Sequence, residues 1–102
     1  MIGYCTIGVK DMEKAKAFWS GLLSEVGGSV QFDGGRIAMI GTAMDKPCVA
    51  VCVPFDENDP NPGNGNMIAL SAESKEMVDK LHAKALELGA SDEGAPGQRI
   101  AD

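Results

Sequence analysis

Apolar positions in the first 27 residues change from a strand pattern to helical spacing. Residues 2–9 interleave β-branched and aromatic side chains with polar ones, which predicts a strand. Asp11 then offers a carboxylate to the free amides of a first helical turn, and Gly27 ends the stretch, because glycine enters the left-handed region at low cost. The stripe between them is apolar at helical spacing: Met12, Ala15, Phe18, Trp19, Leu22, Leu23 and Val26.

Three further strands are predicted after this helix. Residues 28–33 and 36–42 flank Gly34 and Gly35, a pair typical of a tight hairpin turn. A turn closed by Pro47 leads to residues 48–53, which are nearly all apolar. A strand of that kind is expected in the centre of a sheet, with both faces buried.

Residues 54–65 are predicted to form a loop. They hold three prolines, two glycines and three asparagines, a composition that no regular element accepts. We interpret the segment as the connector between two halves of the chain, with a functional lid as the alternative.

The opening unit is then repeated. Residues 66–72 resemble a strand, Ser74 is a good N-cap, and Gly89 ends a second amphipathic helix. A shift of 63 residues places Tyr4 on Met67 and Asp11 on Ser74, and it also superimposes the two apolar stripes, so we interpret the pattern as an internal repeat. After the helix there is room for at most one short strand, near residues 98–101.

The expected fold class is therefore α+β. We expect one domain of two βαβββ-type modules, the second truncated, that form a mixed sheet with helices; the family resemblance given below implies that this sheet is curved and that the helices lie on its convex face. Module one spans residues 1–54, the connector 55–65 and the incomplete module two 66–102. Because an unpaired sheet edge is a liability, we expect a homodimer that shares or covers these edges, with the halves paired within one chain or exchanged between two.

Composition narrows the class of partner. A formal charge of −6 and a pI near 4.6 argue against nucleic acid and anionic membranes. No apolar run approaches the roughly 18–20 residues that span a bilayer, and the start lacks the pattern of an export signal. The three cysteines are expected to be free thiols in a reducing cytoplasm, since Cys48 and Cys52 on one strand are too far apart to bridge.

In its order of elements the chain resembles the vicinal oxygen chelate superfamily, which includes glyoxalase I, bleomycin and fosfomycin resistance proteins and extradiol dioxygenases. Residues 4–19 are similar to the first strand and helix of that family. Residues 53–56 and 63–70 look like the middle of its small members, and residues 93–97 resemble the turn after the second helix. The resemblance implies two strand-lined clefts that form one cupped cavity.

The resemblance also implies positions for a divalent metal, held by His, Gln or Glu. Aligned on the acidic helix cap, three of these positions fall on Tyr4, Ala50 and Met67, and a fourth falls beyond Asp102. None of the three is a usual ligand, because such an ion needs converging carboxylates or imidazoles. We therefore predict no cofactor and no metal site.

Strand alternation indicates which side chains face the expected cavity. The resulting surface is mostly apolar, as a pocket for a small hydrophobic molecule would be, and the alternative is that these residues pack against each other or a dimer mate. Phe18 and Trp19 are expected in the core, and His82 at the border of the second stripe. The predicted cavity residues are Tyr4, Thr6, Cys48, Ala50, Cys52, Met67 and Ala69.

Three functions fit this picture. The first is a glyoxalase/bleomycin-resistance-like small-molecule binding protein without the usual metal site, whose cavity a dimer partner completes. The second is a metal-dependent lyase, similar to lactoylglutathione lyase, or a dioxygenase, with ligands from an absent C-terminal strand or a partner chain. The third is a structural or interaction module with a degenerate site. The sequence favours the first.

Overall fold

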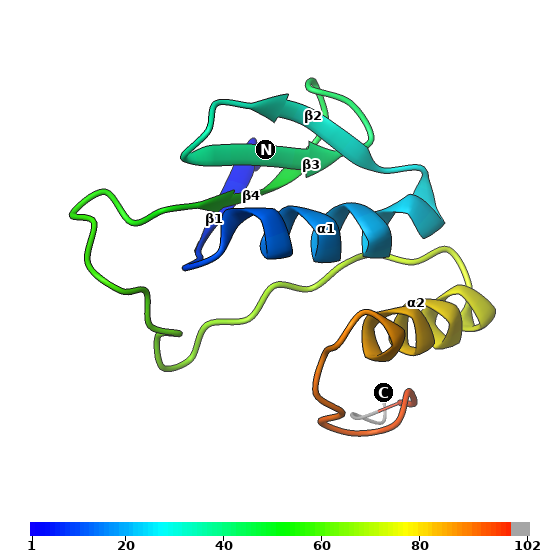
Figure 1. Cartoon of the computed structure of the whole chain (residues 1–102). Helices are drawn as coiled ribbons and strands as arrows, with labels where there is room; N and C mark the ends of the chain where they lie inside the picture. The colour runs from blue at the N-terminus through cyan, green and yellow to red at the C-terminus, as the bar shows by residue number, and fades with distance from the viewer. Residues whose placement is uncertain (99–102) are drawn as a thin grey trace.

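A four-stranded mixed sheet with a helix against one face organises the first half of the chain (Figure 1). The computed structural model describes residues 1–98. The strand order is β1-β4-β3-β2, with β1 parallel to β4 and the other neighbours antiparallel. The predicted α+β class and the central place of the apolar fourth strand are confirmed. The strands are β1 (Tyr4–Gly8), β2 (Ser29–Asp33), β3 (Ile37–Gly41) and β4 (Cys48–Cys52).

The helix that follows β1 begins and ends where its local signals predict. It is α1 (Met12–Leu23), and Asp11 Oδ1 accepts a hydrogen bond from the Lys14 backbone N–H at 3.0 Å. Its last turn tightens into the 3₁₀ segment η1 (Ser24–Val26), and Gly27 then adopts φ 83°. The left-handed conformation of this glycine ends the helix and turns the chain toward β2, without the strain that a Cβ would add.

The core is the layer between α1 and the sheet. Ile40 and Val51 are its largest fully buried side chains, and Leu23 closes it from the helix. Ala38 and Val49 complete the buried cluster, and three residues of the predicted α1 stripe pack against it while partly exposed: Met12, Ala15 and Trp19. Successive strand residues point to opposite faces, so the even-numbered β4 positions lie on the face without α1.

Arg36 fixes the direction in which the connector leaves β4. Its Nη2 donates to the backbone oxygens of Val53 at 3.1 Å and Pro54 at 3.0 Å, and its guanidinium lies 5.7 Å from the centre of the Phe55 ring. From there to residue 65 the chain is irregular, as its proline and glycine content predicts.

The predicted strand over residues 66–72 is wrong, because the structure places no helix or strand there. The segment has the composition of a strand, but a strand needs a hydrogen-bonded neighbour, and the only sheet among residues 1–98 ends at β1. Met67 is left 87% exposed as a result. The short strand predicted near residues 98–101 lies almost entirely outside the described residues.

The second helix forms as predicted and packs on the first. It is α2 (Lys75–Glu87), with Ser74 Oγ accepting from the Met77 N–H at 3.1 Å, and Gly89 follows it at φ 107°. Gly21 lets Leu88 approach α1 closely, since a Cβ there would lie 3.1 Å from a Leu88 methyl carbon. Both helices lie on the same side of the sheet in Figure 1.

An ion pair ties α1 to β2 and makes part of the stability depend on pH. Lys16 Nζ lies 2.8 Å from Asp33 Oδ2, and this side-chain hydrogen bond, followed by one from the Gly35 N–H, lowers the pKa of Asp33. A carboxyl whose pKa is lowered on folding adds stability above its unfolded pKa of about 3.9, and that stability is lost as the pH falls through the folded value.

We therefore expect the urea midpoint of the protein to fall between about pH 6 and about pH 3, and to fall less in Asp33→Asn. The matched control is Asp45→Asn in the turn before β4, which should keep the full acid sensitivity. Equal acid sensitivity in Asp33→Asn and the parent chain would contradict the assignment.

Candidate functional site

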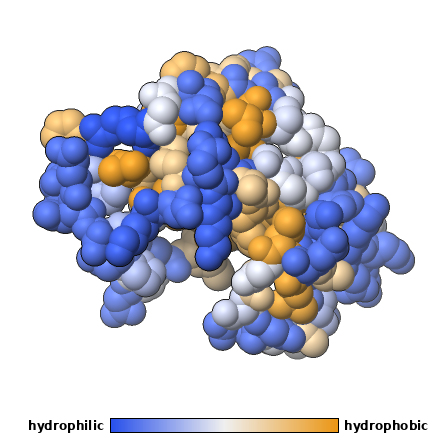
Figure 2. Space-filling model, in the orientation of Figure 1, coloured by the Kyte–Doolittle hydropathy of each residue, from blue (hydrophilic) through white to orange (hydrophobic). Residues whose placement is uncertain are grey.

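The larger hollow of the molecule is a groove along β1 and one face of α1. Its other wall consists of the end of the connector and the residues after α2, and its volume is about 1230 Å³. β1 lies at the edge of the sheet, and no strand from residues 1–98 fills the space beside it. Figure 2 shows apolar residues exposed in the middle of this face, beside a hollow in the lower part of the molecule.

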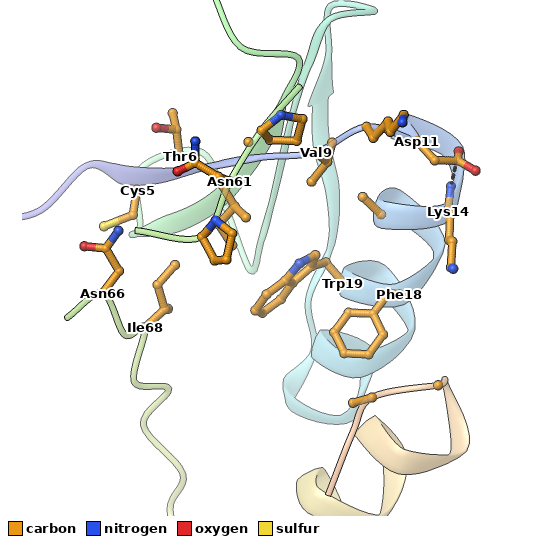
Figure 3. A pocket seen from close by; sticks show the side chains of 18 of the residues that line it. Cys5, Thr6, Val9, Asp11, Lys14, Phe18, Trp19, Asn61, Asn66 and Ile68 are labelled. Atoms are coloured by element: carbon orange, nitrogen blue, oxygen red, sulfur yellow. Dashed lines mark hydrogen bonds between the residues drawn. The ribbon is translucent and has the colours of Figure 1, made fainter. Parts of the chain in front are cut away.

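The floor of the groove is aromatic. Phe18 and Trp19 lie edge to face, with ring centroids 5.5 Å apart and planes at 87°, a favourable geometry for an aromatic pair. In Figure 3 both rings face the space between β1 and the second half of the chain. Val9 comes from the end of β1, and Ile68 and Leu88 come from the opposite wall.

The two ends of the groove differ in charge. At the start of α1 the lining includes Lys10, Asp11 and Lys14. At the other end the lining includes Cys5 and Asn66 and none of its Lys or Asp side chains (Figure 3). The groove thus combines an apolar middle, a neutral polar end and an end with two ammonium groups.

A smaller hollow of about 430 Å³ continues from the first. Cys5 and Ile68 line both, and the smaller one extends to Cys48 in the sheet and Leu81 in α2. Residues 66–71 therefore border open space along the side of β1. This is the position at which the sequence predicts a strand.

The sheet brings five of the predicted cavity residues onto one face. The register opposes Tyr4 to Cys48 and Thr6 to Ala50, and Cys52 follows by alternation. This face lies opposite α1, because the intervening β4 residues belong to the helix-side core. Tyr4 is 50% exposed and Ala50 is fully buried, so the rim of the face offers more surface than its centre.

The other two predicted cavity residues lie off the sheet. Met67 borders the larger groove, together with Thr6, and Ala69 borders the smaller one, together with Cys48. The seven residues therefore surround β1 on several sides instead of lining a single cup. Their role in binding stays a prediction.

The donor set does not fit the divalent metal that the family resemblance implies. Ala50 has no donor atom, the Met67 thioether is soft, and a neutral Tyr4 is a poor ligand. Within residues 1–98 no group of three or more His, Cys, Asp or Glu side chains converges as a metal site would require. The same part of the chain holds no helix long and apolar enough to cross a membrane.

The order of elements and the open, helix-backed sheet define the class of protein. The model of the Glyoxalase/Bleomycin resistance protein/Dioxygenase superfamily matches residues 1–102, and the chain belongs to that family. The predicted family resemblance is confirmed.

One solved structure shows the same fold. It is described as a glyoxalase/bleomycin resistance protein from Albidiferax ferrireducens T118 and superposes with a TM-score of 0.78 at 24% sequence identity. The match covers 87% of this chain and 70% of that chain. Comparison with curated protein sequences gives no significant match.

The groove residues on α1 are not recognised as functional from the sequence. Phe18 and Trp19 belong to an apolar stripe and are predicted to be core, yet the structure leaves both partly exposed in the groove. No pattern in the sequence separates these two residues from the core positions of the stripe. His82 is partly exposed, as predicted, with Nε2 3.5 Å from Asp92 Oδ1.

Proposed function

We propose that this chain binds a small organic molecule with an apolar body, in the groove between β1, α1 and the second half of the chain. The observation that supports the proposal is the combination of volume and lining. A drug-sized ligand fills a cavity of roughly 300–1000 Å³, lined mainly by apolar and aromatic side chains with few polar groups. The groove of about 1230 Å³ exceeds this range because it is open to solvent, and its lining, with Phe18 and Trp19 on the floor, has the apolar and aromatic character of such a site.

Binding without a metal is the form of this function that the residues favour. The three aligned family positions hold no usual ligand, so the proposed site recognises its ligand by apolar contact and polar side chains. A lyase or dioxygenase of the family type would need ligands that residues 1–98 do not bring together.

Trp19 is the only tryptophan in the chain, so its fluorescence reports directly on the groove floor. We expect octan-1-ol, a neutral apolar probe, to cause a saturable change in Trp19 emission. Phe18→Ala should weaken the affinity by about tenfold, equivalent to about 1.4 kcal/mol, because the ligand loses one aromatic contact.

The control is Met44→Ala, which alters a side chain that is 55% exposed in the turn between β3 and β4 and lies outside the groove. This variant should bind octan-1-ol like the parent chain. The proposal is wrong if titration and calorimetry detect no saturable binding, or if Phe18→Ala binds as tightly as the parent.

We also propose that a second copy of the chain covers the sheet face opposite α1. Three observations support this: neither helix of residues 1–98 packs on that face, its rim carries half-exposed Tyr4 and Phe32, and Met39 and Ile37 between them are partly exposed. Apolar surface of this kind is stabilised by burial against a partner. The groove lies beside β1 and the α1 face, so such a homodimer would leave it open.

The cysteines support a reducing compartment such as the cytoplasm. All three are free: Cys5 is exposed, Cys48 is buried, and Cys52 is partly exposed. Exposed thiols persist where glutathione and thioredoxin keep them reduced. We propose a cytoplasmic protein on this basis.

A further inference from the structure

We propose that the ligand of the groove is an organic carboxylate with an apolar body, held by the aromatic floor and oriented by the Lys14 ammonium group. This inference rests on the proposed function and names the class of molecule that the same groove would take. It comes from the difference in charge between the two ends of the groove, and from which charged side chains there already have an ion-pair or hydrogen-bond partner.

The lining at the charged end of the groove contains more ammonium groups than carboxylates, unlike the chain as a whole. The chain carries a net charge of −6, but the groove lining contains Lys10 and Lys14 against a single carboxylate, Asp11. The net negative charge of the chain disfavours an anion at long range, whereas the Lys14 ammonium group in the groove lining is a favourable contact for one. Charge complementarity therefore selects both the sign and the orientation of the ligand.

Each charged group at this end has a partner except one. Lys10 Nζ lies 3.7 Å from Asp59 Oδ2. Asp11 caps α1 by accepting from the Lys14 backbone N–H at 3.0 Å, which commits this carboxylate to the helix. In the part of the chain that the structure describes, no carboxylate pairs with the Lys14 side chain.

The distance along α1 between Lys14 and the aromatic floor of the groove matches a short amphiphilic ligand. Lys14 and Phe18 are four residues apart on one face of α1, a rise of about 6 Å at about 1.5 Å per residue. A carboxylate at Lys14 thus places the first carbons of its chain over Phe18, and the remainder beside Trp19. Ile68 and Leu88 would cover the chain from the other wall.

The uncharged end of the groove favours a ligand that carries a single negative charge. Thr6, Asn61 and Asn66 line the groove away from Lys14, and their side chains offer hydrogen bonds without charge. A dianion would leave one carboxylate without a cationic partner there. We therefore assign a monocarboxylate.

The test compares ligands of equal length that differ only in the head group: octanoate, octan-1-ol and octylammonium. In the parent chain we expect octanoate to bind about fivefold more tightly than octan-1-ol, and octylammonium more weakly than both, because the lysine end repels a cation. Trp19 fluorescence gives the dissociation constants. The preference for octanoate should decrease with added salt, since an exposed charge contact is screened.

Lys14→Gln should lower the octanoate-to-octanol affinity ratio to about one, since Gln is one atom shorter than Lys, stays polar and carries no charge. Lys46→Gln, at an exposed lysine of the turn before β4 that lies outside both hollows, should keep the ratio of the parent.

The outcomes separate the two proposals. Equal affinities for octanoate and octan-1-ol in the parent chain would overturn the carboxylate inference and leave the proposed binding function in place. An unchanged ratio in Lys14→Gln would overturn the role of Lys14. Absence of binding by all three probes would overturn both proposals.

Discussion

Ile40→Ala is expected to destabilise the protein by about 2–5 kcal/mol, which is a large part of the roughly 5–15 kcal/mol that holds a domain folded. Ile40 is fully buried in the middle of β3, where it pairs with Val49 of β4 and Val30 of β2. Removing three carbons there leaves a cavity in a helix-side cluster that contains only five buried residues among those the structure describes. A core this small has few neighbours that can move to fill the gap.

Thermal and urea denaturation measure the effect. Ile40→Val should cost about 0.5–1.5 kcal/mol, which gives a graded series at one site. The matched control is Val30→Ala on the paired strand, because Val30 is 41% exposed and its truncation should cost less than about 1 kcal/mol. If Val30→Ala proved as destabilising as Ile40→Ala, the helix-side core would be placed wrongly.

Phe32→Glu is expected to weaken self-association of the chain by about 10- to 100-fold, on the proposal that a second copy covers the sheet face opposite α1. Phe32 is 49% exposed and opposes Met39, which in turn opposes Ala50, so its ring lies on that face. A glutamate there places a charge inside the interface, where burial of an unpaired carboxylate is strongly unfavourable.

Light scattering across a dilution series in the micromolar range measures the dissociation constant. Met44→Glu is the control, since Met44 is 55% exposed in the turn between β3 and β4 and lies outside the sheet. It should associate like the parent chain. A parent chain that is monomeric throughout the series would overturn the dimer proposal, while octan-1-ol binding to that monomer would leave the groove proposal standing.

Elements fixed by local signals are the ones that the sequence predicts well. The Asp11 and Ser74 caps, the left-handed Gly27 and Gly89, and the apolar run of β4 each act through neighbours a few residues away, and the structure has all of them as predicted. The strand predicted over residues 66–72 is wrong for the opposite reason. A strand exists only with a neighbour, and its neighbour is chosen by the tertiary arrangement.

Part of the candidate site could likewise be predicted from the sequence, and part of it could not. Alternation places Tyr4, Thr6, Cys48, Ala50 and Cys52 on one sheet face, as the register shows. The groove itself depends on where α2 and the connector lie, and no pattern in the sequence reports this. Phe18, Trp19 and Lys14 therefore enter the site only once the second half of the chain is positioned in space.

The contacts of Arg36 determine where the second half of the molecule is tethered. Because this side chain holds the backbone at Val53 and Pro54 and contacts Phe55, the tether begins after that ring and spans residues 56–65. Ten extended residues reach at most about 36 Å, more than twice the 14.1 Å radius of gyration. The second half can therefore dock on α1 of its own copy or on α1 of a neighbouring copy. A tether of this length gives the second half an effective concentration in roughly the millimolar range around its own first half. Exchange of the second half between two copies would therefore compete with docking inside one copy only when the protein concentration approaches that value.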